Sequence, residues 1–543
     1  MSQKNEFKVV SFKAKRGTIF DRNGITLAYD AAEYKLTYTP STPYPDKLTA
    51  LLGRYNIAHL NSIDINKKQS WLLSRKQVIS ISSHLHNFPS LKLETHLKRK
   101  YTYGILTAHL IGLFGKNDNT NLQHYPRYER SARAQIGKSG VEKDYEQILA
   151  GTPGIKRIHT DARGNVKSEK VVFEAKPGND LKLTIDIELQ KAAADSLRGH
   201  KGALVAIQPR TGDILAIVSS PSFDPDIFYD PNKSSLLGKT INDKNQPMFN
   251  RAINGLYSPA STIKPMLALG GLNAKVVTPT EKIFDPGYFY IPGSKHRFNN
   301  WYASGQGYVD IIKAIQVSCD TYFYNLAYKM GINMMFDTLH KFGFGQSTGT
   351  FPGESIGYVP KHDSEQNTWH TGNTIITGIG QGKLLVTPLQ LALATATISL
   401  NGARIQPRIT LGHGALGKIT DPTGQRQKAN IQYDSMVWKT VITGMQKSLG
   451  PHGTGRILAT LPMTLAGKTG TAQLVKIDRS KTLPQNLQDN SLLIAYSPIE
   501  NPEIAIALII ENEHQSTHVG KKFLTAWLSL HDKQKAKPGL QAT

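Results

Sequence analysis

Three short strings occur in a fixed order along the second half of this 543-residue chain, and they constrain its fold more than any other feature. They are Ser261-Thr-Ile-Lys264, Ser318-Cys-Asp320 and Lys468-Thr-Gly470. Each string alone carries little weight, because roughly one or two S-x-x-K matches are expected by chance in a chain this long. The combination, the order and the local context of the strings therefore decide what they mean.

The first string stands at the predicted start of a helix. Ser261 follows a turn, Tyr257-Ser-Pro-Ala260, and precedes an apolar run at 266–272 with helical composition. A helix N-terminus offers free N–H groups and a dipole that favour developing negative charge. Lys264 lies one turn further on the same face, and a lysine held beside a serine in a dry pocket can act as a base. Taken alone, the string would be a helix cap followed by a solvated lysine.

The second string opens another predicted helix, in which Tyr322, Leu326 and Met330 follow at helical spacing. A hydroxyl at Ser318 would relay a proton to a leaving amine, and Asp320 would hydrogen-bond neighbouring groups and a substrate backbone. A helix N-cap with an acidic first turn explains the same residues.

The third string continues an alternating stretch from Met463 and predicts an edge strand. Gly467 and Gly470 indicate that a ligand backbone approaches closely, which is the usual meaning of glycine inside a strand. Lysine and threonine side chains on this strand would meet an anionic carboxylate. The N–H groups of Ser261 and Thr471 are the natural pair for an oxyanion hole.

Together the strings form the S-x-x-K, S-x-[ND], K-[TS]-G set of serine enzymes that acylate themselves on D-alanyl peptides or β-lactams. We therefore predict that the three strings share one active site. Its predicted catalytic residues are Ser261, Lys264, Ser318 and Lys468, and its predicted substrate-binding residues are Asp320, Thr469, Gly470 and Thr471.

The chain also resembles the class B penicillin-binding proteins over nearly its whole length. Further strings carry the resemblance, namely Arg16-Gly-Thr-Ile-Phe-Asp-Arg-Asn-Gly24, Gly137-Lys-Ser-Gly-Val-Glu-Lys-Asp-Tyr-Glu146, Thr184-Ile-Asp-Ile-Glu-Leu-Gln190, Phe284-Asp-Pro-Gly287 and Gly378-Ile-Gly-Gln-Gly382. Division relatives usually carry Asn where this chain has Asp320, so the resemblance favours the elongation branch. It implies a peptidoglycan D,D-transpeptidase that cross-links stem peptides through a serine acyl-enzyme during cell elongation and is a target of β-lactams.

The resemblance also implies partners and a location. The partners are peptidoglycan stem peptides, a SEDS-family (RodA-type) glycosyltransferase and periplasmic rod-shape proteins. The family works at the periplasmic face of the bacterial inner membrane, held by one membrane helix just upstream of the string that begins at Arg16. This chain starts only fifteen residues before Arg16, so we expect that the anchor has been removed.

The hydrophobic pattern of the second part predicts an α+β fold. Residues 204–207 and 214–218 flank a turn and predict one hairpin, and residues 492–496 and 504–510 predict another. A helix with Phe523, Leu524, Trp527 and Leu528 follows the second hairpin. Hairpins at both ends predict one antiparallel sheet, with its first and last strands together and helices packed on it. This is the arrangement of the transpeptidase domain in the resembling family.

The domain organisation follows from a change in this pattern. Residues 1–175 lack a long apolar core stretch, which predicts an elongated, dimerisation-type pedestal with a head-like insertion at about 46–130. Residues 176–535 form the predicted transpeptidase domain, and residues 536–543 are a short polar tail.

A metal site is implied by the resemblance but incomplete in this chain. Several members of the family bind a structural zinc near the active site through Asp, Asp, His and Cys. Asp285 and Cys319 match the first and last ligands, whereas Asn300 and Gln306 occupy the middle two positions. A site that lacks two of four ligands is not expected to hold zinc tightly, so we predict no metal and no cofactor. His296 lies nearby and is an alternative ligand.

The composition and net charge limit the kinds of partner that the protein is expected to bind. The net charge of +24 would suit nucleic acid, but Lys and Arg are scattered and no nucleic-acid-binding motif appears, so we predict no such partner. A basic surface instead suits anionic lipid headgroups and carboxylate-rich stem peptides. The apolar run at 384–400 contains Pro388 and Gln390 and predicts a core helix, not a membrane span.

Two alternatives stay open. A D-Ala-D-Ala carboxypeptidase or a β-lactamase would use water as the acceptor. Glu354 lies in a plausible loop for activating that water, but Tyr358 stands where class A lactamases have Asn. A β-lactam-sensing or scaffolding module would work through its pedestal, and the three intact strings argue against it.

Overall fold

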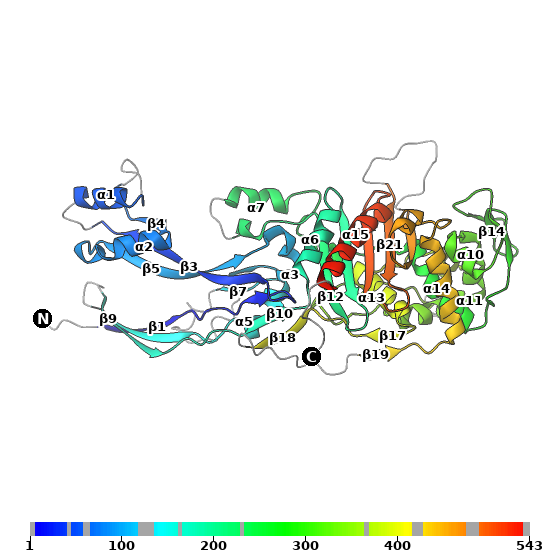
Figure 1. The fold of residues 1–543 in the computed structure, drawn as a ribbon, viewed down its shortest axis with the longest axis horizontal. Coiled ribbons are helices and arrows are strands. Elements are labelled where there is room, and N and C mark those ends of the chain that lie inside the picture. The colour runs from blue at the N-terminus through cyan, green and yellow to red at the C-terminus, as the bar shows by residue number, and fades with distance from the viewer. Residues whose placement is uncertain are drawn as a thin grey trace.

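The computed structural model describes residues 6–40, 45–57, 64, 66–117, 135–160, 166–228, 233–362, 369–414, 427–473 and 488–535. These residues form an elongated molecule, with a strand-rich N-terminal part at one end and a larger α+β part at the other (Figure 1). The predicted tail at 536–543 lies outside the described residues, as do parts of the predicted head-like insertion.

A five-stranded antiparallel sheet with the order β12-β11-β22-β21-β20 forms the centre of the larger part. The strands are β11 (Gly202–Gln208), β12 (Asp213–Ser220), β20 (Ala466–Ala472), β21 (Asn490–Ser497) and β22 (Ile504–Ile510). Strand β11 pairs with β22, so the first and last strands lie together as predicted. Both predicted hairpins form, and β20 is at the edge of the sheet, as the sequence indicated.

Helices cover both faces of this sheet, which explains why strands β11, β12, β21 and β22 are buried along nearly their whole length. Successive residues of β11 point to opposite faces, so Val205 joins one core cluster and Leu204 the other. The first face packs on α13 (Pro388–Ser399), and the second packs on α6 (Ile187–Ser196) and α15 (Ser516–Lys535). The fold class is therefore the predicted one, a sheet between two layers of helices.

The N-terminal part consists of two long arms, seen at the left of Figure 1. In one arm, β3 (Thr26–Tyr38) pairs with β5 (Leu91–Tyr101) and β4 (Gln69–Leu73), and α1 (Pro45–Arg54) and α2 (Arg75–Ser82) share a small core with them. The other arm is a three-stranded sheet of β1 (Glu6–Phe12), β8 (Gly154–Thr160) and β9 (Val166–Phe173). The exact boundaries of the pedestal and its head stay predictions.

A shared sheet joins the two parts of the molecule. Strand β10 (Asp180–Leu183) pairs in parallel with β2 (Ile19–Phe20) from the start of the chain. On its other side β10 pairs with β18 (Thr410–Gly414), which comes from the larger part. Because hydrogen bonds continue through all three strands, the pedestal is tied to the body of the molecule at its base.

Buried ion pairs hold two of the family strings together in the pedestal. Arg16 Nε donates to Glu142 Oε2 at 2.6 Å, and Arg99 Nε donates to Glu142 Oε1 at 2.7 Å. All three side chains are buried, and Arg99 also pairs with Asp30. Removing one member would leave the others as uncompensated buried charges, which typically costs about 3–5 kcal/mol. The strings therefore serve the fold of the pedestal.

Within the described ranges, no helix is both long and apolar enough to cross a membrane. The apolar run at 384–400 forms α13, a core helix as predicted. Thr387 caps this helix by accepting from the N–H of Gln390, whose own side chain bonds back to the cap.

Candidate active site

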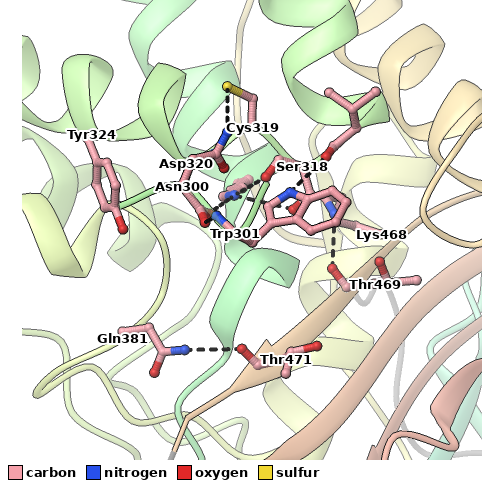
Figure 2. Close-up of polar contacts among 12 residues, drawn as sticks. Asn300, Trp301, Ser318, Cys319, Asp320, Tyr324, Gln381, Lys468, Thr469 and Thr471 are labelled. Carbon is pink, nitrogen blue, oxygen red and sulfur yellow. Dashed lines mark hydrogen bonds and ion pairs between the residues drawn. The ribbon is translucent and has the colours of Figure 1, made fainter. Parts of the chain in front are cut away.

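The three strings converge on one cleft of about 1680 Å³ beside the edge strand β20. Six of the predicted residues line this cleft, namely Ser261, Ser318, Asp320, Thr469, Gly470 and Thr471. The other two, Lys264 and Lys468, have no exposed surface. Figure 2 shows Ser318 and Asp320 on one side and the strand from Lys468 to Thr471 on the other. The structure thus brings all eight predicted residues together.

Ser261 follows a strained residue and precedes a buried helix. It lies in the short helix η7 (Ala260–Ile263), which runs directly into α9 (Lys264–Asn273). Ala260 has a φ of 49°, which alanine rarely adopts, and its N–H donates to Gly380 O at 2.8 Å. Such strain persists only where the surroundings hold it, and it is concentrated at functional sites. Gly380, from one of the family strings, therefore fixes the turn that presents Ser261.

The glycines of β20 allow a close approach, but the approaching atoms belong to the protein. A Cβ at Gly470 would lie 3.1 Å from Thr262 Cγ2 and 3.2 Å from Pro259 O. A Cβ at Gly467 would lie 2.2 Å from Ile494 O on the neighbouring strand. The turn before α9 and strand β21 fill the space beside these two glycines, so packing within the protein already requires them. The expected approach of a ligand backbone along the strand stays a prediction.

Lys264 connects the first string to the second. Its Nζ donates to Ser318 O at 2.9 Å and to Ser318 Oγ at 3.3 Å, and it pairs with Asp320 Oδ1 at 2.6 Å. These contacts use all three N–H donors of a lysine ammonium group. Lys264 is thereby fixed one turn after Ser261, within reach of the hydroxyl of the second string.

Ser318 stands in a tight turn and does not cap the following helix. Its φ is 57°, and α11 (Asp320–Lys341) begins after Cys319, which is the N-cap residue. The N-cap interpretation of Ser318 was therefore wrong. Because the left-handed turn directs Ser318 Oγ toward Lys264 and not along the helix, the hydroxyl lies in the cleft.

Two further residues of the cleft, Trp301 and Gln381, bond directly to predicted site residues. Trp301 donates its main-chain N–H to Asp320 Oδ2 at 3.1 Å, and its ring, 55 % exposed, lines the cleft. Gln381 Nε2 donates to Thr471 O at 3.1 Å, as Figure 2 shows. The family string at 378–382 contains Gln381 and was the available signal. Nothing in the local pattern marked Trp301, because its contact with Asp320 uses only its main-chain N–H, while its indole N–H donates to the main-chain carbonyl of Val317 at 3.2 Å.

Burial sets the protonation of Lys468. The side chain is fully enclosed, and its Nζ donates to the carbonyl of Thr469 at 3.0 Å. Loss of hydration, and then the positive charge of the nearby Lys264, hold the pKa of Lys468 well below the ordinary lysine value, although Asp320 opposes them. A neutral amine at this position can accept a proton.

We predict that replacing Lys468 with methionine changes how stability depends on pH. The unfolded chain keeps the lysine protonated up to about pH 10, whereas the folded protein releases that proton earlier. Wild-type stability should therefore rise with pH relative to Lys468→Met, by up to about 1.4 kcal/mol per pH unit, until the ordinary lysine pKa is reached. Urea unfolding of both proteins at pH 7, 8 and 9 measures this difference, and parallel pH curves would contradict it.

The residues at the expected metal position are linked by hydrogen bonds. Asp285 Oδ2 accepts from Asn300 Nδ2 at 2.6 Å, from the Gln306 main-chain N at 3.0 Å and from Cys319 Sγ at 3.3 Å. The side chain of His296 is exposed. In the part of the chain that the structure describes, no three His, Cys, Asp or Glu side chains gather as a metal-binding group. An amide and a main-chain N–H thus face Asp285 where two ligands would be needed, so the residues present do not fit a zinc ion.

We therefore predict that the purified protein carries no stoichiometric zinc. Neutral hydrogen-bond donors already surround Asp285, and Asn300 is a poor zinc ligand. Elemental analysis of protein purified without chelators checks this. A value near one zinc per chain would overturn the prediction and would implicate His296 together with Asp285 and Cys319.

Glu354, the candidate for activating water in a β-lactamase, holds a turn in the structure. Its carboxylate accepts from Ser347 Oγ at 2.5 Å, Thr348 Oγ1 at 2.7 Å and Gly349 N at 2.8 Å. It is not among the described residues that line the cleft. The β-lactamase alternative therefore has no support from Glu354.

Comparisons with known proteins agree with this architecture. Residues 202–528 match the family described as penicillin-binding protein transpeptidase domain, and residues 11–183 match the penicillin-binding protein dimerisation domain. The peptidoglycan D,D-transpeptidase MrdA of Acinetobacter baumannii is 36 % identical over 99 % of this chain and 84 % of the relative. MrdA of Escherichia coli K12 is 32 % identical over 96 % of this chain and 87 % of the relative.

Solved structures show the same likeness. Pseudomonas aeruginosa PBP2 in complex with WCK 5153 has a TM-score of 0.74 at 32 % identity, covering 96 % of this chain and 97 % of that one. The Helicobacter pylori PBP2–MreC complex has a TM-score of 0.78 at 25 % identity, covering 98 % and 100 %. A peptidoglycan synthase complex has a TM-score of 0.82 at 26 % identity, covering 100 % of this chain and 94 % of that one.

The fold and the converging strings define the class as the penicillin-binding transpeptidases, proteins with a serine acylation site on an antiparallel sheet. Within that class, the two MrdA relatives align with nearly the whole chain, including both the dimerisation and the transpeptidase domain. The chain belongs to the MrdA, or penicillin-binding protein 2, family of peptidoglycan D,D-transpeptidases.

Proposed function

We propose that this protein cross-links peptidoglycan stem peptides during cell elongation as a serine D-Ala-D-Ala transpeptidase, and that β-lactams inhibit it by acylating the same serine. One observation carries the proposal: Ser261, Lys264 and Ser318 meet strand β20 around a single cleft. The terminal D-Ala-D-Ala of a donor stem would lie along residues 468–471, with its carboxylate near the hydroxyls of Thr469 and Thr471.

Acylation begins at Ser261. The ammonium group of Lys264 first gives up one proton to solvent. Ser261 Oγ then attacks the penultimate carbonyl carbon while the resulting neutral amine of Lys264 takes the hydroxyl proton. The main-chain N–H groups of Ser261 and Thr471 stabilise the resulting oxyanion. The bond to the terminal D-alanine then breaks. The proton passes from Lys264 to Ser318 Oγ, 3.3 Å away, and on to the departing nitrogen. Lys468, whose pKa is lowered by burial, lies beside this route and can exchange a proton with it.

Deacylation uses the same groups, with the proton now moving from the attacking amine back to Ser261. The amine of a neighbouring stem peptide attacks the ester carbonyl, and its surplus proton leaves through Ser318 and Lys264. The oxyanion again forms against the same two N–H groups, and its collapse returns the proton to Ser261. The product is a new amide bond between two stems.

We further propose that the pedestal, residues 1–175, couples cross-linking to glycan synthesis at the periplasmic face of the inner membrane. It contains none of the eight predicted site residues. The similar solved structures include a complex of PBP2 with MreC and a peptidoglycan synthase complex that coordinates polymerization and crosslinking. We propose MreC-like rod-shape proteins and a SEDS-family, RodA-type glycosyltransferase as partners; the PBP2–MreC complex supports the first, and the second is implied by the resemblance alone.

We predict that the 543-residue chain is acylated by a penicillin but cross-links polymerised glycan slowly when alone. A SEDS-family glycosyltransferase should increase cross-linking, because it supplies nascent glycan in the orientation that the cleft needs. Muropeptide analysis by mass spectrometry, with and without the glycosyltransferase, measures this, and Ser261→Ala with the glycosyltransferase present is the control. Fast cross-linking that the glycosyltransferase leaves unchanged would contradict the coupling, and absence of cross-links under all conditions would contradict the transpeptidase itself.

A further inference from the structure

A buried hydrogen-bonded cluster lies directly behind the second string. Its members are Asp285, Asn300 and Cys319, each at most 1 % exposed. Asn300 lines the wall of the cleft, whereas Asp285 and Cys319 are not among the described residues that line it. None of the three has a role in the proton transfers proposed for Ser261, Lys264 and Ser318. The hydrogen bonds from this cluster to neighbouring residues, above all to Asp320, indicate its role.

Asn300 links the cluster to the active site by using both ends of its amide. Its Nδ2 donates to Asp285 Oδ2 at 2.6 Å. Its Oδ1 accepts the main-chain N–H of Asp320 at 3.1 Å. Asp285 is in turn fixed by the main-chain N–H groups of Gly287, at 2.8 Å, and Gln306, at 3.0 Å. Asn300 thus connects Asp285, at the end of β13 (Ile283–Asp285), to Asp320, the first residue of α11.

The neighbouring residue holds the same aspartate from the other side. The main-chain N–H of Trp301 donates to Asp320 Oδ2 at 3.1 Å, while Asp320 Oδ1 pairs with Lys264 at 2.6 Å. Residues 300 and 301 therefore fix both the backbone and the carboxylate of Asp320. Because Lys264 is held by that carboxylate, a displacement of Asn300 would be transmitted to the proposed base.

The amide of Asn300 cannot be replaced by a carboxylate without a change in charge. An aspartate at position 300 could still accept from the Asp320 N–H, but it would place a second negative charge against Asp285 and would lose the donor. A divalent cation would compensate such a pair, and Cys319 Sγ, 3.3 Å from Asp285 Oδ2, would provide a further ligand. An amide therefore performs here, without charge, the linking role that a metal would perform between two carboxylates.

We propose that Asn300 is a positioning residue for the transpeptidase reaction: its amide bridges Asp285 and Asp320 and so holds Lys264 in place without a metal ion. The inference rests on the proposed function, because Lys264 matters only if Ser261 is acylated. Asn300 touches no reacting atom, and its effect is on the rate of acylation through Asp320 and Lys264.

The test compares Asn300→Ala and Asn300→Asp with wild type, measuring the acylation rate by a fluorescent penicillin with and without added Zn²⁺. Without metal, both variants should acylate at least about tenfold more slowly, since small misplacements of reacting groups have effects of this size or larger. Zn²⁺ should restore Asn300→Asp to near the wild-type rate and should bind it at about one ion per chain. It should not restore Asn300→Ala, which lacks the second carboxylate.

A structural role alone would lower the unfolding temperature without this dependence on zinc. Asn242→Ala, a surface asparagine whose side chain bonds within its own helix, is the matched control and should acylate like wild type. If Asn300→Ala does not fold, the acylation rate of the near-isosteric Asn300→Asp, measured with and without Zn²⁺, tests the inference by itself. Wild-type rates in a folded Asn300 variant, or zinc restoring both variants or neither, would overturn the inference. Failure of wild type to be acylated at Ser261 would instead overturn the proposed function.

Discussion

Replacing Ser261 with alanine is expected to abolish covalent labelling by a penicillin. Among the residues that the structure describes, only Ser261 combines a hydroxyl in the cleft, a lysine one turn further on and a strained turn that fixes its position. The substitution removes one oxygen from a half-buried side chain and leaves η7 and α9 unchanged, so the unfolding temperature should stay close to that of wild type. Intact-mass analysis after incubation with the antibiotic measures the labelling.

The matched control for this variant is Ser258→Ala, in the same turn. It removes the same atom three residues earlier and should label like wild type. Undiminished labelling of the Ser261→Ala protein would refute the assignment of the nucleophile. Loss of labelling in both variants would point to a collapsed turn, and the unfolding temperatures of the two proteins would reveal it.

Replacing Lys264 with alanine is expected to reduce the acylation rate by at least about 100-fold, the typical effect of losing a general base. The same substitution removes the cation that pairs with Asp320 at 2.6 Å. Breaking a buried ion pair from one side typically costs about 3–5 kcal/mol, so the variant should also unfold at a lower temperature. Stopped-flow acylation, measured well below that temperature, separates the two effects.

A double variant distinguishes catalysis from stability. Lys264→Ala with Asp320→Asn removes the orphan carboxylate charge and should recover part of the lost stability. Its acylation should stay slow, because no amine replaces that of Lys264. Acylation that returned along with stability would show that Lys264 serves the fold and not the chemistry.

Much of the fold and site was predictable because the signals are local. Residues 204–218 and 492–510 alternate or run apolar on the scale of single strands, and hairpins of this kind pair with their sequence neighbours. The resemblance then implied that Ser261, Ser318 and Lys468 meet, although they lie far apart in the chain. The cleft contains all three strings.

What could not be predicted depends on contacts between distant backbones. The strained conformation of Ala260 is held by a hydrogen bond from its N–H to the carbonyl of Gly380. The space beside Gly470 is filled by the turn at 259–262. Neither has a local signature in the sequence. Likewise β10 joins β2 and β18 into a sheet common to both parts of the molecule, and such non-local pairing has no periodicity of its own.

The resemblance implied a metal position around Asp285 and Cys319 but gave no role to the residues that stand there instead of ligands. In the sequence, Asn300 is recognisable only as a poor zinc ligand at a position where the resembling family has Asp. The structure shows that its amide bonds to Asp285 and Asp320 at the same time, which requires all three residues to be in place. The part that the Asn300 amide plays therefore follows from its geometry and has no signal in the sequence.

The central claim is that Ser261 is the acylated nucleophile of a transpeptidase, and one measurement tests it most directly. The wild-type protein is incubated with a penicillin, its intact mass is recorded, and the adduct is located by peptide mapping. The account predicts a single adduct on the peptide that contains Ser261. An adduct on another residue, or no adduct on folded protein, would contradict it.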